Sequence, residues 1–121
     1  MQYMLLIYGD ESQWSEVSEK TSAAETAGWN AYTEAITAEG IMRGGDALHP
    51  TASATTVRVR DGQAQVTDGP FAETREQLGG FYVIEAGSLD EALDWAAKIP
   101  GALTGSVEVR PIMDYEAMQA S

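Results

Sequence analysis

The sequence contains no cysteine, and its 121 residues include a single histidine, His49. Without cysteine the chain can have no disulfide bond, thiolate nucleophile or cysteine-ligated metal ion. One histidine, with carboxylates that lack metal-ligand spacing, gives little support for a metal site, and we expect none. No apolar run could span a bilayer, and no basic segment precedes the strand-length run Met4–Tyr8 as it would in a signal peptide. We therefore expect a cytoplasmic protein without a membrane span.

Basic side chains are also scarce. The sequence has seven lysines and arginines but 19 aspartates and glutamates, so the formal net charge is −12. A chain of this charge repels phosphate backbones and anionic lipid surfaces, which argues against nucleic acid or membranes as partners. The sequence also lacks a phosphate-cradling glycine loop, a nucleotide fingerprint and a serine-hydrolase elbow. We expect no cofactor.

The chain is long enough for one domain, residues 1–121, and too short for two. Tyr3–Tyr8 and Gly80–Ala86 are apolar on both alternating faces, which is typical of strands covered on both sides at the centre of a sheet. Ile41–Leu48 resembles a strand bulged at its paired glycines, and Ser106–Met113 alternates like a half-buried strand.

Capping patterns predict two helices. Ser22–Glu25 has the capping-box form and opens a helix that runs to about Glu39 and ends at Gly40. Its buried stripe comprises Trp29, Tyr32 and Ile36. Ser88–Glu91 opens a second helix, stopped by Pro100-Gly101, with apolar residues Leu89, Ala92, Leu93, Ala96 and Ile99. Between the first strand and the first helix, Trp14 either fills the core, which we favour, or covers a pocket.

Thr55–Thr67 predicts a β-hairpin. The dipeptide Asp61-Gly62 favours a two-residue type I′ turn, which sets the pairing of the flanking strands. In that register the valines and Ala64 share one face, and the arginines and glutamines share the other. One further step places Asp68 on the apolar face, opposite Thr55. A carboxylate there must find partners or line a polar cavity.

The resulting order is βαββαβ with an inserted hairpin, an α+β fold of the ferredoxin-like kind. Two helices can cover only one face of the sheet, yet its central strands are apolar on both. A second copy of the same sheet could cover the open face. We therefore predict a homodimer joined face to face, a dimeric α+β barrel.

The quoted residues carry a family resemblance. The segments YMLLIYGDE, TTVRVRDG, VTDGPFAETREQLGGFYVIEA, SLDEALDWAAKIP and VEVRPIM resemble the YCII-related family, specifically its DGPF-motif branch. The resemblance implies a dimeric α+β barrel with ferredoxin-like subunits. Members of the broader family are proposed enzymes that use a His–Asp pair, and relatives of the fold include isomerases and dehalogenating enzymes. Genes of the branch often lie beside those of extracytoplasmic-function sigma factors, which implies a functional link to one.

This chain departs from the family at the proposed dyad. Alignment through Glu39-Gly40 and Lys98-Ile99-Pro100 places Trp29 at the histidine position and Ile99 at the aspartate position. Neither side chain transfers protons, so any chemistry must come from other residues.

Asp68 and His49 are the candidate catalytic residues. On an inward strand face, Asp68 could act as a general base, although capping the turn before Gly69 is the favoured role. His49 could pair with Asp68 or Asp46 as an acid–base couple, although a structural role is favoured for a lone histidine before proline.

The candidate ligand-binding residues are Tyr8, Phe71, Glu73, Arg75 and Tyr82. Arg75 could hold a carboxylate, with Glu73 at the pocket mouth, or could pair with a neighbouring glutamate in a solvated loop. Phe71 could pack in the core or the dimer seam. Tyr8 and Tyr82 could present hydroxyls at a cleft or fill the core.

Three functional hypotheses remain open, and the sequence does not decide whether the chain is an enzyme. We favour a small protein that binds a ligand in the cleft of a homodimer. The alternative is a cofactor-independent lyase or isomerase that acts on a small anionic or cyclic substrate with Asp68 as general base. The third is a protein–protein module tied to sigma-factor signalling.

Overall fold

The computed structural model describes residues 1–14 and 19–119, with the backbone alone for 13–14 and 19–25. The predicted role of Trp14 and the side-chain bonds of the Ser22–Glu25 capping box lie outside the described residues. Among those residues, no helix is long and apolar enough to cross a membrane.

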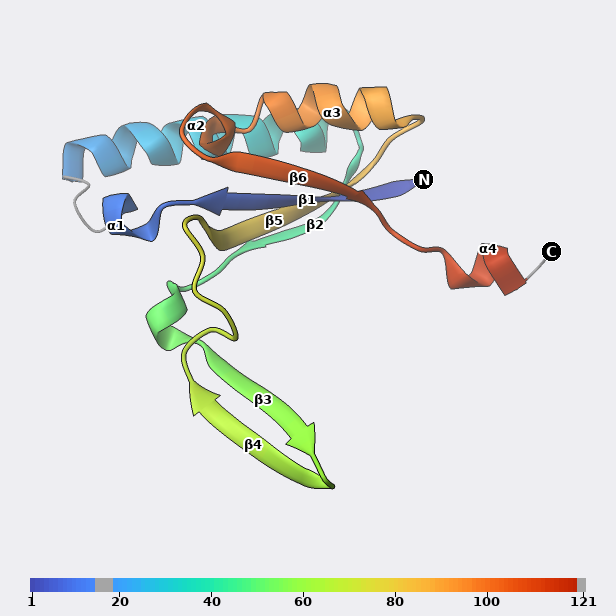
Figure 1. Ribbon diagram of the computed structural model, residues 1–121. Coiled ribbons are helices and arrows are strands. Elements are labelled where there is room, and N and C mark those ends of the chain that lie inside the picture. Colours follow the sequence, from blue (N-terminus) through green and yellow to red (C-terminus); the bar gives the residue numbers. More distant parts are fainter. Residues whose placement is uncertain (15–18, 120–121) are drawn as a thin grey trace.

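A four-stranded antiparallel sheet forms the body of the molecule (Figure 1). Its strands are β1 (Gln2–Gly9), β2 (Met42–Ala47), β5 (Gln77–Glu85) and β6 (Ser106–Pro111), in the spatial order β2-β5-β1-β6. The two strands predicted to be central, β1 and β5, do lie in the middle. The register of β2 against β5 shifts between Met42 and Gly44, which confirms an irregularity next to the paired glycines.

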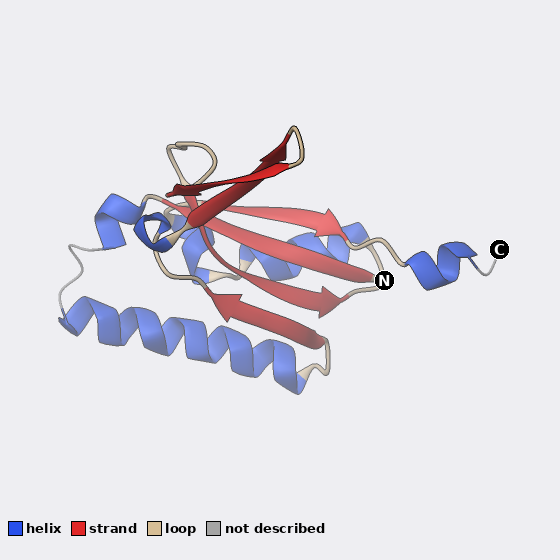
Figure 2. Ribbon diagram, turned by 90° about the horizontal axis from the view of Figure 1, so that it is seen from below, coloured by secondary structure: helices blue, strands red, loops and turns tan. Residues whose placement is uncertain are grey.

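Two helices, α2 (Glu19–Ala38) and α3 (Leu89–Ala97), cover the same face of this sheet (Figures 1 and 2). The core lies between the layers, where side chains from both meet: Tyr3, Leu5, Tyr32, Ile36, Ile84, Ala92, Ala96 and Ile99. The α+β class and the βαββαβ plan with a hairpin are confirmed. The strand order and the two-layer arrangement are those of a ferredoxin-like fold.

The helix ends partly follow the predicted caps. α2 begins at Glu19, three residues before the predicted Ser22, so the predicted start was wrong. Its other end has the expected form, because the Gly40 and Ile41 N–H groups donate to the carbonyls of Thr37 and Ile36.

The cap of α3 is confirmed. The Ser88 hydroxyl accepts a hydrogen bond from the Glu91 N–H at 3.2 Å, and the Glu91 carboxylate accepts one from the Gly87 N–H at 2.8 Å. Of the apolar residues on this helix, Ala92 and Ala96 are buried, whereas Leu89 and Leu93 are exposed.

The hairpin β3 (Thr55–Arg60) and β4 (Gln63–Asp68) has the predicted register throughout, from Arg60 against Gln63 to Thr55 against Asp68. Asp61 and Gly62 have φ of 53° and 76°, as a type I′ turn requires. The hairpin forms a sheet of its own and extends from the face opposite the helices (Figure 1). Its apolar face is uncovered in the single chain.

Shorter elements connect these parts. α1 (Glu11–Trp14) follows β1, and the 3₁₀ turn η1 (Thr51–Ser53) leads into the hairpin. A second 3₁₀ turn, η2 (Pro100–Leu103), joins α3 to β6. The short helix α4 (Tyr115–Gln119) stands away from the sheet at the C-terminal end (Figure 1).

Candidate functional site

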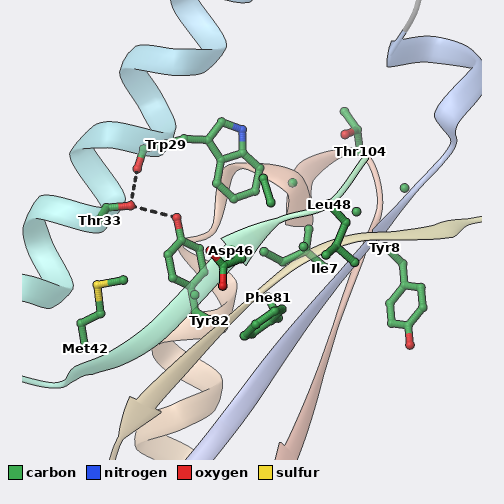
Figure 3. A pocket seen from close by; sticks show the side chains of 16 residues that line it. Ile7, Tyr8, Trp29, Thr33, Met42, Asp46, Leu48, Phe81, Tyr82 and Thr104 are labelled. Carbon is green, nitrogen blue, oxygen red and sulfur yellow. Dashed lines mark hydrogen bonds between the residues drawn. The ribbon is translucent and has the colours of Figure 1, made fainter. Parts of the chain in front are cut away.

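A pocket of about 490 Å³ lies between α2, η2 and the β2–β5 side of the sheet (Figure 3). Its lining comes from the end of β1, from α2, from β2 and the residue after it, from β5 and from the η2 region. The volume falls within the range usual for small-molecule sites. The fold therefore provides a cavity large enough for a compact organic molecule.

The wall on the helix side consists of Trp29 and Thr33, which are one turn apart on α2 and so share a face. Tyr82 of β5 lies opposite them, with its ring centroid 6.5 Å from that of Trp29 and the two ring planes 20° apart. On its other side Tyr82 contacts the ring of Tyr32, with the centroids 5.1 Å apart. Tyr82 thus connects the buried core to the pocket.

Gly45 determines how closely Tyr82 packs against β2. A Cβ atom at this position would lie 2.9 Å from both the Phe81 carbonyl oxygen and Tyr82 Cδ1, distances that real Cβ atoms do not reach. Gly45 faces Tyr82 across the β2–β5 ladder. The glycine at the predicted break in this strand therefore makes room for the aromatic wall.

A short chain of hydrogen bonds runs along the pocket wall. The Tyr82 and Thr33 hydroxyl oxygens are 2.9 Å apart, and the Thr33 hydroxyl donates to the Trp29 carbonyl at 3.0 Å. Figure 3 shows the Tyr82 hydroxyl turned toward Thr33. These bonds fix the orientation of the Tyr82 side chain.

The residues lining the pocket, all of them described, include one carboxylate, Asp46, and no lysine, arginine or histidine. Most of the other lining residues are aromatic, aliphatic or glycine. Tyr32, behind the wall, has a raised pKa, first because it is buried and second because Tyr82 is close. The described lining is therefore mainly apolar and has no cationic side chain.

Of the predicted site residues, the structure places Tyr8 and Tyr82 in the pocket lining. Asp68 and His49 lie outside that lining, and both are exposed. The Asp68 side chain makes no hydrogen bond with any described residue. The turn beside it is held instead by the Gly69 N–H, which donates to the Ala54 carbonyl at 2.7 Å, and by the Thr56 hydroxyl, which donates to the Gly69 carbonyl at 2.8 Å.

Phe71, Glu73 and Arg75 also lie outside the pocket lining, in the exposed connection between β4 and β5. Phe71 is 77% exposed, so it does not pack into the core of its own chain. Within one subunit the predicted site residues therefore form two groups, one in the pocket lining and one outside it. The roles predicted for the five residues outside the pocket stay predictions.

Sequence reasoning missed Thr33. Its spacing of four residues from Trp29 was the available signal, since residues so spaced share a helix face. Nothing local, however, indicated that Tyr82, 49 residues away, would meet it.

Residues 1–116 match the model of the YCII-related domain family. The chain belongs to this family. An uncharacterized protein of Rhizobium meliloti (strain 1021) is 45% identical to it over 122 residues, which cover 96% of this chain and 95% of that protein.

In this YCII-related chain, two positions align with the His–Asp pair proposed for the broader family. They are Trp29 and Ile99, and their surroundings differ. Trp29 lines the pocket, and its indole packs close to Gly101 of η2. Ile99 is completely buried in the core. The pocket is therefore present next to the first of these positions, but it is lined there by an indole rather than an imidazole.

Proposed function

We propose that this chain is a cytoplasmic protein that binds a small, largely apolar molecule in the pocket between α2 and the β2–β5 side of the sheet. The observation that carries the proposal is the cavity itself, with a volume of about 490 Å³. Its lining combines aromatic walls with a few fixed polar groups, which is the usual make-up of a small-molecule site.

The binding unit that we propose is a homodimer. Met4 and Leu6 of β1 pair with Val83 and Phe81 of β5. They alternate with the residues that contact the helices, so they face the opposite side of the sheet. None of them is fully buried in one subunit. A second sheet packed on this face would cover them.

The DGPF segment, Asp68 to Phe71, supports assignment to the DGPF branch and to the dimeric α+β barrel superfamily. Through that resemblance we also propose a functional link to an extracytoplasmic-function sigma factor. Catalysis is not part of the proposal, because within one subunit the pocket lining does not include Asp68.

A ligand screen against a pocket-blocking variant tests the proposal. Thr104 is exposed at the pocket, so Thr104→Trp would place an indole in its mouth. A matched control is Thr26→Trp, at an exposed position of α2 outside the pocket. We expect compounds from a chemically diverse library to raise the melting temperature of the wild type and of the control but not of Thr104→Trp.

Amide chemical-shift changes should localise binding to α2, β2 and β5. If no library compound of any charge stabilises the wild type, or if Thr104→Trp binds the same compounds equally well, the proposal is wrong.

A further inference from the structure

The Tyr82 hydroxyl can act only as a hydrogen-bond acceptor toward the pocket, because its single proton is already used. The Thr33 hydroxyl has one proton, and it donates that proton to the Trp29 carbonyl at 3.0 Å. The contact of 2.9 Å between Thr33 Oγ1 and Tyr82 Oη must then use the proton of Tyr82. Tyr82 has no second proton to offer a ligand, and its oxygen keeps a free lone pair.

The described part of the lining also lacks a cationic donor. Among the described residues, no lysine, arginine or histidine borders the pocket, and the one carboxylate residue of the lining is Asp46. Asp46 pairs with Phe81, one step along the ladder from the Gly45–Tyr82 pair, so its side chain lies on the other face of the sheet from Tyr82. A ligand carboxylate or phosphate beside Tyr82 would therefore meet no countercharge from the described lining.

The aromatic walls favour a positive charge for a separate reason. The faces of indole and phenol rings attract cations, and indole does so most strongly. Trp29 and Tyr82 lie with ring planes only 20° apart at the pocket wall. The net charge of −12 further favours a cationic ligand over an anionic one.

We propose that this pocket selects protonated organic amines with a flat apolar body, and that the ammonium group donates a hydrogen bond to the Tyr82 hydroxyl oxygen beside the Trp29 and Tyr82 rings. The inference rests on the proposed function, because it specifies the ligand class of the same pocket. It differs from the sequence-based hypothesis of an anionic substrate held by Arg75, which lies outside the pocket lining.

Three probes, each a phenyl ring with a two-carbon chain but with different end groups, test the proposal: phenethylamine, phenethyl alcohol and phenylacetate. Their dissociation constants for the wild-type protein can be measured by calorimetry at neutral pH and low ionic strength. We expect the amine to bind at least about tenfold more tightly than the alcohol, as expected for a charge-assisted hydrogen bond. We expect phenylacetate to bind most weakly.

The variant Tyr82→Phe removes the acceptor and keeps the ring. We expect it to weaken amine binding about tenfold and to weaken the alcohol less, because the alcohol can donate only a neutral hydrogen bond. Tyr115→Phe is the control, since Tyr115 is exposed on α4 and lies outside the pocket lining.

Thr33→Val provides the sharpest readout. Valine is close to threonine in shape but cannot accept the Tyr82 proton, so the phenol becomes free to donate to a ligand. The preference for amine over alcohol should then shrink or reverse. A general loss of folding would weaken all three probes together and would not change their order.

The outcomes separate this proposal from the proposed function. If the alcohol or phenylacetate binds the wild type as tightly as the amine, the amine assignment is wrong while small-molecule binding stands. If none of the three probes binds, the amine assignment is also wrong, and small-molecule binding is judged by the broader library. If Tyr82→Phe leaves the amine affinity unchanged, Tyr82 is not the acceptor, and the proposal fails.

Discussion

Glu11 holds Thr51 with both oxygens of its carboxylate. The Thr51 N–H and hydroxyl each donate to a different oxygen of Glu11, both at 2.6 Å. The Glu11 N–H in turn donates to the Gln77 side chain at 3.0 Å. Because Thr51 opens η1, these bonds join the start of α1 to the connection that leads into the hairpin and to the first residue of β5.

Glu11→Ala should therefore loosen the base of the hairpin. We expect the free energy of unfolding to fall by about 1–2 kcal/mol, since two charge-assisted bonds are lost at a half-buried position. Urea denaturation measures this loss, and amide exchange should accelerate at Thr51 and in β3. Glu73→Ala, in an exposed loop, should change stability by less than about 0.5 kcal/mol. Equal effects of the two substitutions would show that the contact is unimportant.

Tyr32 should make the fold sensitive to alkali. Burial is the main cause of its raised pKa, and the nearby Tyr82 adds to it. In the unfolded chain the phenol ionises near pH 10. Below that pH both states are protonated and the stabilisation is complete. As pH rises above 10 the unfolded state loses its proton first, so stability decreases.

Tyr32→Phe should flatten the decline in stability above pH 10. At neutral pH it should cost about 1 kcal/mol, because the Tyr32 hydroxyl donates to the Trp95 carbonyl at 3.0 Å and that bond is lost. Denaturant titrations at several pH values give the slope of the free energy of unfolding against pH. The exposed Tyr115 is the control, and Tyr115→Phe should leave the slope unchanged. An unaltered slope in Tyr32→Phe would contradict the assignment.

Substitutions at the core positions that sequence periodicity selects should destabilise the fold much more than substitutions at exposed apolar positions. Ile84 of β5 is completely buried, whereas Leu103 of η2 is 88% exposed. We expect Ile84→Ala to reduce the free energy of unfolding by about 2–5 kcal/mol, through lost burial and the cavity left behind. Leu103→Ala should change it by less than about 0.5 kcal/mol. Thermal or urea unfolding of both variants measures the contrast.

Much of the fold was predictable because its signals are local. The type I′ turn at Asp61-Gly62 determines the register of a whole hairpin, and Ser88 marks the start of α3 within one turn. The apolar character of β1 on both faces similarly predicted its central place. The start of α2 was misplaced by three residues, because a capping pattern at Ser22 does not prevent a helix from beginning earlier.

The candidate site was much less predictable. The carboxylate, histidine and arginine that sequence patterns selected for chemistry lie outside the pocket lining. The lining depends on how α2 packs over β5, which brings Thr33 within 2.9 Å of Tyr82. Such a contact reflects tertiary packing across 49 positions of the chain, and no short motif encodes it.

The proposed homodimer makes a direct prediction about the open face of the sheet. Val83 of β5 pairs with Met4 of β1 on the side away from the helices, and neither is fully buried in one chain. In a dimer joined through this face, Val83→Lys would bury a charge without a partner, which is strongly unfavourable. We expect wild-type protein at micromolar concentration to sediment as a dimer, and Val83→Lys to sediment as a monomer.

Leu103→Lys is the matched control, because Leu103 is exposed on η2, outside that face, and its substitution should leave the dimer intact. Circular dichroism should show that both variants keep their helices and strands. Two results would contradict the face-to-face arrangement: a wild type that sediments as a monomer, or a Val83→Lys variant that remains dimeric. In the second case, the exposed valines of the hairpin, Val57, Val59 and Val66, would be the next surface to test in the same way.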